Sequence, residues 1–257
     1  INFDIPSLEK LTLDDSAGAV KSLNKLKNLR VLYLHEYRGE KINLPNLLEI
    51  ECRGKIDKFS YLPQTLVKLD CSFSTISHID LPCLKELYCE RTNITKVNHL
   101  VNLEVLDCSC CEIKFIDLPK LKKLFCREVN IGKIDHLSAL EELEITFSRF
   151  NFIYHPTLKK LKHNGIFKAE ANPIIIDTPN LIKLKSYRAI IGKIIAPKLK
   201  ILECVNSDLD NFDDFTELES LNCDQCSQVK TINLPLLKIL KCTKTGIISV
   251  DHLINLK

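Results

Sequence analysis

Three cysteines lie within four positions of the segment LEVLDCSCCEIKFIDLP, which spans residues 103–119. Cys108, Cys110 and Cys111 belong to a residue type that binds zinc, and neighbouring thiols can also carry out redox chemistry. A structural zinc site needs four ligands that converge on one point. The elements that hold the thiols therefore decide which chemistry is available to them.

A short leucine pattern recurs along the chain and gives most of the cysteines a common place in it. Segments such as LVKLDC, LKELYC, LEVLDC and LKKLFC follow one another at a spacing of 18 or 19, which rises to 21 and 23 at two places. The leading leucines are Leu8, Leu29, Leu47, Leu66, Leu84, Leu103, Leu121, Leu140, Leu158, Leu181, Leu199, Leu218 and Leu237, and Leu256 begins a further unit. Self-similarity at such a period is typical of a solenoid built from stacked repeats.

These residues resemble the leucine-rich repeat family, through the motif LxxLxCxxxxIxxI followed by Asp or Asn. Cysteine takes the sixth position of the motif, counted from the leading leucine. The ninth position carries residues such as Ser74, Thr92 and Ser207 where the family has Asn, so no regular asparagine ladder is expected. The resemblance implies a leucine-rich repeat solenoid of the α/β horseshoe class with a parallel β-sheet on its concave side. The units also look similar to repeats of bacterial effectors and giant-virus proteins.

We expect one leucine-rich repeat domain over residues 1–257, with about thirteen repeats and the start of another, as part of a longer chain. The first, fourth and sixth residues of each LxxLxC strand should face inward, where stacked neighbours bury a continuous core. Units this short leave little room for the return segment. This predicts mostly extended or 3-10 turns and little α-helix on the convex side.

The repeat favours a core role for the cysteines over a metal or redox site. Eight of them occupy the sixth position: Cys52, Cys71, Cys89, Cys108, Cys126, Cys204, Cys223 and Cys242. A buried free cysteine behaves as a small hydrophobe, and one thiol per repeat does not surround a zinc ion. We expect Cys110 on the exposed side and Cys111 turned inward, with no metal and no cofactor. Unoxidised thiols favour an intracellular, reducing, cytoplasmic location, with association with a virion as an alternative.

Binding residues of such a fold would lie between the inward ones, on the concave sheet. The second position alternates in charge through Lys85, Glu104, Lys122 and Glu141. Opposite charges on adjacent strands favour the stacking of neighbours. Aromatic residues recur at the fifth position, as Tyr33, Tyr88 and Phe125. Aromatic side chains anchor protein interfaces, but they also suit any strand, and both interpretations stay open.

The ninth and tenth repeats depart from the pattern in three ways. Extra residues lengthen their spacing to 23, and His163 and Ser186 replace the core cysteine. The exposed strand positions carry several basic residues and a tyrosine, and no acidic residue is found among Lys159, Lys160, Lys162, Lys183, Lys185, Tyr187 and Arg188. A decayed repeat with a tolerated insertion would explain this. The functional alternative is a site for an acidic partner surface or a phosphate group.

Together these features predict a non-enzymatic protein–protein recognition module that binds another protein, one with an acidic surface, on its concave face. No nucleophile–base pair, glycine-rich phosphate loop or metal spacing stands apart from the repeat. A structural component of a larger assembly such as a virion, and a substrate receptor of a ubiquitin ligase, are the alternatives. The net charge of +3 does not favour nucleic acid. No deep pocket is implied for a small-molecule substrate, and no apolar run favours a membrane.

Overall fold

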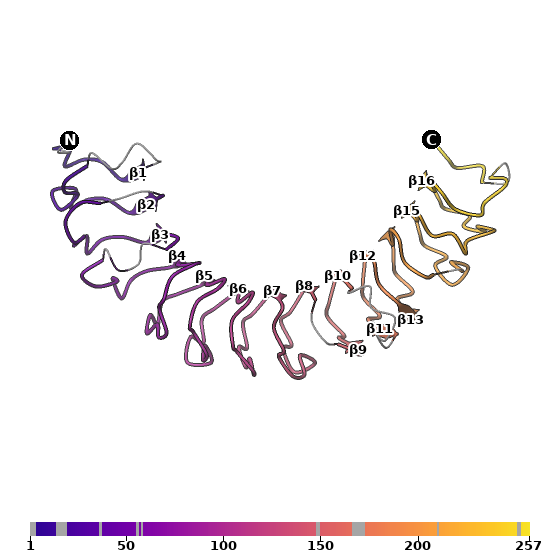
Figure 1. Cartoon of the computed structure of the whole chain (residues 1–257), viewed down its shortest axis with the longest axis horizontal. Coiled ribbons are helices and arrows are strands. Elements are labelled where there is room, and N and C mark those ends of the chain that lie inside the picture. The colour runs from indigo at the N-terminus through magenta and orange to yellow at the C-terminus, as the bar shows by residue number, and fades with distance from the viewer. Residues whose placement is uncertain are drawn as a thin grey trace. The chain divides into compact units, whose positions relative to one another are not determined.

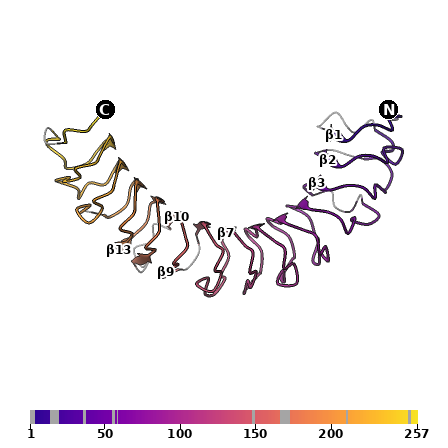
Figure 2. The same cartoon turned by 180° about the vertical axis from the view of Figure 1, so that it is seen from behind.

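The computed structural model describes residues 4–13, 20–35, 38–54, 57, 59–147, 150–165, 173–209, 211–250 and 253–257. The chain divides into two compact units, one made of Ile1–Phe125 and Val129–Lys133 and the other of Cys126–Glu128 and Ile134–Lys257. Each unit is a stack of coils in which a short strand alternates with a return segment (Figures 1 and 2). No α-helix occurs among the described residues, so the expectation of extended return segments is confirmed there. Most of the insertion in the ninth repeat lies outside these residues.

The first unit contains seven strands that follow the chain order across one parallel sheet. They are β1 (Lys10–Leu13), β2 (Val31–Leu34), β3 (Glu49–Glu51), β4 (Lys68–Asp70), β5 (Glu86–Tyr88), β6 (Val105–Asp107) and β7 (Lys123–Arg127), whose last residues belong to the second unit. The register pairs equivalent repeat positions, so that Leu106 lies between Leu87 and Leu124. The predicted LxxLxC strands are therefore observed in the predicted parallel arrangement.

The second unit continues the pattern with six strands in one parallel sheet. They are β8 (Glu142–Thr146), β10 (Lys160–Asn164), β12 (Lys183–Tyr187), β14 (Ile201–Glu203), β15 (Ser220–Asn222) and β16 (Ile239–Lys241). Leu161 on β10 lies in register between Leu143 and Leu184. Each sheet has one face turned to the coil interior and one turned outward, which we call the open face.

A second, smaller sheet occurs on the return segments of the second unit. It consists of the parallel strands β9 (Phe152–Tyr154), β11 (Ile174–Asp177) and β13 (Ile191–Ile195), in the order β13-β11-β9. Alternate residues such as Ile153 and Ile176 are buried, while Phe152 and Ile175 face outward. Extended turns were predicted here from the sequence, but their pairing as strands was not.

The interior of both units is a column of leucines. The leading leucines from Leu29 to Leu121 in the first unit, and from Leu140 to Leu237 in the second, are 0% exposed. Burying one leucine side chain stabilises a fold by about 1.5–3 kcal/mol relative to leaving it in water. Stacking of equivalent leucines therefore accounts for the packing of coil on coil.

Each strand is followed by a turn, and in most coils the eighth repeat position of that turn lies in the left-handed region. The φ angles there run from 50° at Arg188 to 67° at Gly54. The other members are Phe73, Arg91, Cys110, Glu128, Phe147, Asn206, Gln225 and Lys244. Their amide groups bond the neighbouring coil, as Gln225 N–H does to the Thr243 carbonyl oxygen at 2.7 Å. Contacts between coils, rather than glycine residues, therefore hold this conformation.

Asparagines placed just before the leading leucine connect successive coils. The Asn102 amide donates to the Pro82 carbonyl oxygen at 2.9 Å, and the Asn180 amide donates to that of Pro156 at 2.7 Å. Asn28, Asn46 and Asn255 make the equivalent contact in their coils. Asparagine contacts between coils therefore occur in five places, at a different position from the one at which the family pattern places its asparagines.

Candidate functional site

The cysteines of the CSCC segment lie where the repeat predicted them. Cys108 is 0% exposed and Cys111 is 5% exposed, while Cys110 is half-buried in the left-handed turn. All twelve cysteines are free. The sixth-position thiols donate to backbone carbonyl groups of the next coil, as Cys89 Sγ does to the Asp107 oxygen at 3.2 Å. Burial raises the pKa of Cys71 and of Cys223 to about 12, which keeps these thiols protonated.

Three coils of the second unit break this series of thiol hydrogen bonds: Ile145 replaces the cysteine in one of them, and a polar residue replaces it in the other two. His163 and Ser186 stand at the cysteine position and are 6% and 0% exposed. His163 Nδ1 and Ser186 Oγ have no hydrogen-bond partner in the described structure. The two residues lie in register on β10 and β12, on the side of the sheet opposite the open face.

The basic residues predicted from the sequence form a cluster on the open face above these two strands. Lys160 pairs in register with Lys183, and Lys162 pairs with Lys185. We call these four side chains the lysine quartet. Tyr187 lies further along β12, opposite Asn164. Like charges directly opposite each other on neighbouring strands destabilise a sheet, so the quartet is an electrostatically costly arrangement.

Glutamates on the flanking strands compensate part of this charge. Lys162 Nζ lies 2.6 Å from Glu144 on β8, and Lys185 Nζ lies 2.9 Å from Glu203 on β14. Lys160 Nζ is 3.8 Å from Glu142. The basic pattern of the sequence alone does not contain these partners, although the acidic residues at the same positions of neighbouring repeats were a usable signal.

Tyr187 and Glu203 form a hydrogen bond at one side of the quartet, with Oη donating to the carboxylate. Burial, together with this hydrogen bond, raises the pKa of Tyr187 to about 12. Burial alone would raise the pKa of Glu203, but hydrogen bonds from Tyr187 and Lys185 lower it. Glu203 is therefore held as a charged carboxylate beside the lysines.

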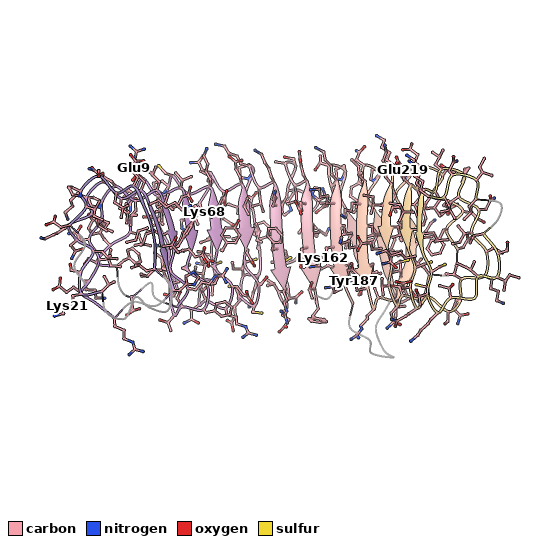
Figure 3. All side chains as sticks on the ribbon, turned by 90° about the horizontal axis from the view of Figure 1, so that it is seen from above. Glu9, Lys21, Lys68, Lys162, Tyr187 and Glu219 are labelled. Carbon is pink, nitrogen blue, oxygen red and sulfur yellow. The ribbon has the colours of Figure 1, made fainter. Side chains whose placement is uncertain are left out.

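The quartet lines a hollow of about 440 Å³ on the open face, together with Tyr187, Glu142 and Glu144. Figure 3 shows Lys162 and Tyr187 over the strands of the second unit. Two predicted residues lie outside the hollow. Lys159 pairs with Glu141 at 2.9 Å, and Arg188 occupies the exposed left-handed turn after β12. The structure thus brings together five of the seven residues of the predicted basic site.

The predicted aromatic residues Tyr33, Tyr88 and Phe125 lie on the open face of the first unit and are half-buried. Lys10 Nζ lies 5.0 Å from the centre of the Tyr33 ring, and Lys68 Nζ lies 5.7 Å from that of Tyr88. Neighbouring cations therefore cover part of the Tyr33 and Tyr88 rings, which leaves both rings less accessible to a partner than their repeat positions alone predict.

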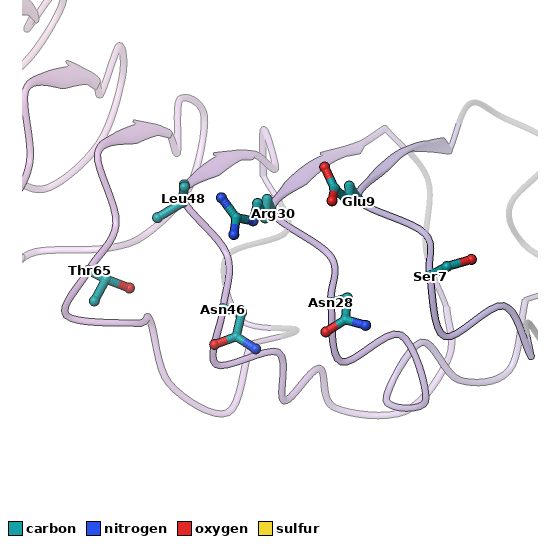
Figure 4. A pocket seen from close by; sticks show the side chains of 7 residues that line it. All are labelled: Ser7, Glu9, Asn28, Arg30, Asn46, Leu48 and Thr65. Atoms are coloured by element: carbon teal, nitrogen blue, oxygen red, sulfur yellow. The ribbon is translucent and has the colours of Figure 1, made fainter.

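A second hollow of about 560 Å³ lies at the beginning of the strands of the first unit, and the sequence analysis did not foresee it. Arg30 and Glu9 extend into it from neighbouring coils, above the amides of Asn28 and Asn46 (Figure 4). Because these amides bond to the preceding coil, they serve the stacking of coils and are not free to bind a ligand.

Two further properties concern the described part of the chain. No group of three or more His, Cys, Asp or Glu side chains there is placed to hold a metal ion. Nothing helical within the described ranges has the length and apolar character needed to cross a bilayer.

Comparison with solved structures identifies the architecture. An internalin (InlF) of Listeria monocytogenes superposes with a TM-score of 0.63 at 18% identity, over 98% of this chain and 86% of the internalin. A leucine-rich repeat protein of Leptospira interrogans superposes with a TM-score of 0.52 at 14% identity, over 94% of this chain and 85% of that one. The fold is the leucine-rich repeat fold.

A third structure with this leucine-rich repeat fold is YopM of Yersinia enterocolitica, with a TM-score of 0.50 at 20% identity. It is matched over 90% of this chain, which spans 63% of YopM. No family model matches the sequence, and no curated protein matches it either. At these identities the likeness concerns the leucine-rich repeat fold alone.

Proposed function

We propose that the chain is a non-enzymatic protein-recognition module that binds an acidic segment of a partner protein on the open, concave face of its sheet. The lysine quartet beside Tyr187 is the observation that carries this proposal. Solenoids offer long continuous surfaces for binding, and tyrosine and cationic side chains are frequent at the centre of protein interfaces.

The charges around the quartet favour a carboxylate-bearing partner. Four ammonium groups on two strands face three glutamates, which leaves the hollow with an excess of positive charge. A carboxylate placed between Lys162 and Lys185 would form charge-assisted hydrogen bonds and relieve their mutual repulsion. Binding of this kind should weaken as the salt concentration rises.

Labelled peptides of defined charge test this proposal directly. A glutamate-rich peptide, the same peptide with glutamine throughout, and a lysine-rich peptide would be compared by fluorescence anisotropy. We expect the acidic peptide to bind best, and the double variant Lys162→Glu/Lys185→Glu to lose about tenfold or more in affinity. Arg188→Glu should weaken binding less, because Arg188 lies outside the hollow.

The matched control is Lys114→Glu/Lys133→Glu, which makes the same change of charge on the return side of the first unit. It should bind the acidic peptide like the parent chain. Equal loss in both double variants would reduce the effect to net charge, and no preference among the peptides would remove the quartet as the binding site.

The aromatic residues Tyr33, Tyr88 and Phe125 remain a second part of the proposed face. Replacing Tyr88 with Ala should weaken binding of a folded partner protein that reaches the first unit, and leave binding of a short acidic peptide unchanged. The peptide and partner assays therefore separate the two parts.

We further propose a single domain over residues 1–257 in a reducing intracellular or virion location. A role in a larger assembly, or as a substrate receptor of a ubiquitin ligase, is compatible with a binding module. Concentration-dependent self-association of the purified chain would favour the assembly role, and a monomer at all concentrations would favour recognition of a separate partner.

A further inference from the structure

Two pairs of cysteines face each other across neighbouring coils, one pair in each unit. Cys111, at the ninth repeat position, donates from Sγ to the carbonyl oxygen of Cys89 in the preceding coil at 2.9 Å. Cys226 makes the same contact with Cys204, also at 2.9 Å. In return, Cys89 and Cys204 donate to the carbonyl oxygens of Asp107 and Asn222, in the coils that carry their partner cysteines, at 3.2 and 3.5 Å. In each pair, one thiol donates to the following coil and the other thiol donates to the preceding coil, so the two hydrogen bonds connect the same two coils in opposite directions.

Several other coils place a hydroxyl group at the ninth position instead of a thiol. Ser74, Thr92 and Thr245 donate to the sixth-position carbonyl oxygen of their own coil, at 2.6, 2.9 and 2.8 Å. Cys71 and Cys223 therefore have a threonine, and no second thiol, at the ninth position of the next coil. The chain itself supplies matched sites with and without a partner cysteine.

We propose that Cys89–Cys111 and Cys204–Cys226 are oxidisable dithiol pairs, each of which forms a disulfide that links two neighbouring coils. The two thiols of each pair interact directly across neighbouring coils, so rotation about their Cα–Cβ bonds is the movement that a disulfide requires. The metal alternative lacks ligands, since no third metal-binding side chain completes either pair among the residues described.

The reaction needs a two-electron oxidant, and hydrogen peroxide supplies the simplest balance. The sulfur of Cys111 attacks one peroxide oxygen, and water leaves as the sulfur becomes a sulfenic acid. The sulfur of Cys89 then attacks that of Cys111, the S–S bond forms and a second water leaves. Two thiols are oxidised and one peroxide is reduced, with no other reactant consumed.

The two thiols of a pair differ in acidity, which assigns their order of reaction. The contact with the Cys89 side chain lowers the pKa of Cys111 to about 6, despite partial burial. The same contact raises the pKa of Cys89. Cys204 lowers the pKa of Cys226 to about 7 in the same way. Cys111 and Cys226 are therefore the nucleophiles, and their burial should make the reaction slow.

Differential alkylation with peptide mapping tests the proposal on the full chain. The background for this experiment is the double variant Cys83→Ser/Cys110→Ser. It removes the exposed thiol of Cys83 and the half-buried thiol of Cys110, which could otherwise react in place of the first pair. After treatment with hydrogen peroxide, unfolding and alkylation, Cys89, Cys111, Cys204 and Cys226 should be protected as two linked pairs. Cys71 and Cys223 should be alkylated in full, and dithiothreitol should reverse the protection.

The variant Cys111→Thr should return Cys89 to full alkylation and leave the Cys204–Cys226 link intact. Threonine already occupies this position in the coils of Thr92 and Thr245, so the variant introduces a residue that the turn accepts. Cys71→Ser is the control and should change neither link. Oxidation should also raise the Tm of the background by several degrees, with no rise in the combined variant Cys111→Thr/Cys226→Thr.

Three results would overturn the proposal. Equal protection of Cys71 and Cys223 would show oxidation without selectivity. A link between Cys108 and Cys111 within one coil would place the disulfide elsewhere. Full alkylation of all four cysteines, under conditions that oxidise a dithiol model peptide, would show that the pairs do not react.

Discussion

His163 on β10 lies in register with Ser186 on β12, and the two residues stand where most coils carry a hydrogen-bonded cysteine. Both side chains are buried, and His163 Nδ1 and Ser186 Oγ lack partners in the described structure. Buried polar atoms without partners cost stability, so the two coils below the lysine quartet pack less favourably than their neighbours.

Acid should therefore destabilise the second unit. Burial lowers the pKa of His163 to about 4, whereas an unfolded histidine titrates near 6.5. Because the unfolded chain binds the proton first, the free energy of unfolding should fall as the pH falls from about 6.5 to 4, by about 3 kcal/mol in total. Burial also lowers the pKa of His155, which acts in the same direction. Urea unfolding at pH 7 and pH 4.5 measures the difference.

His163→Cys should remove most of this pH dependence and extend the series of thiol hydrogen bonds. His136→Gln, on the return side, is the control and should keep it. A slope that persists in His163→Cys would assign the acid sensitivity to other groups.

At an exposed left-handed turn, replacing a residue with glycine should raise the free energy of unfolding, which is the opposite of its usual effect. Gln225 is exposed and has φ of 64°, a conformation that disfavours side chains with a Cβ atom. Gln225→Gly should raise the free energy of unfolding by about 0.5–1 kcal/mol, and Gln225→Val should lower it by about 1 kcal/mol. Gln228→Gly is the matched control, because Gln228 is exposed without a positive φ, and it should destabilise the chain. Thermal unfolding of the three variants gives the comparison.

The asparagine contacts between coils predict a specific effect of one atom. In Asn28→Asp the side chain keeps its shape but loses the donor to the Pro6 carbonyl oxygen, and it places a carboxylate beside that oxygen. The free energy of unfolding should fall by about 1 kcal/mol at neutral pH, as measured by urea denaturation. Asn93→Asp, whose exposed amide contacts Thr75 at the longer distance of 3.3 Å, should cost less. A larger loss in Asn93→Asp would contradict the assignment.

Removing the charge of Lys183 and removing the charge of Lys162 should change the free energy of unfolding in opposite directions. Lys183→Gln removes a charge that opposes Lys160 in register. The change should raise stability by a few tenths of a kcal/mol at low salt, because like charges directly opposite each other repel. Lys162→Gln breaks the contact to Glu144 at 2.6 Å. It should lower stability by a similar amount, as is typical of a partly exposed ion pair.

Salt separates these effects from changes in packing. Both should vanish in about 1 M NaCl, where charges on the open face are screened. Chemical denaturation at two salt concentrations tests the pair, and a difference that survives high salt would show that it does not come from charge.

Much of the fold follows from the sequence because the leucine period is strict. The spacing of Leu84, Leu103 and Leu121 gives the strands, their register and the inward place of Cys108. Other features depend on contacts between coils that a linear pattern does not contain. The left-handed turns at Arg91, Glu128 and Gln225 have no glycine signal, since hydrogen bonds from the next coil impose them. The pairing of β9, β11 and β13 likewise depends on segments of unequal length coming into register.

The candidate site was predicted in part for the same reason. Lys160, Lys162, Lys183 and Lys185 share repeat positions, so the sequence placed them on one face. It did not show that Glu144 and Glu203 contact two of them, because ion pairing depends on side-chain conformations. Cys89 and Cys111 occupy different positions of neighbouring repeats. A comparison of equivalent positions therefore did not reveal that they lie close together.

The turns at the eighth repeat position also bear on how the molecule can change over generations. Side chains as different as Phe73, Glu128 and Lys244 adopt one backbone conformation there because the adjoining coils dictate it. Most of the side chains in this row point to water, so mutation can exchange them at little cost to folding. That row can consequently acquire affinity for new targets while the leucine column beneath it stays unaltered.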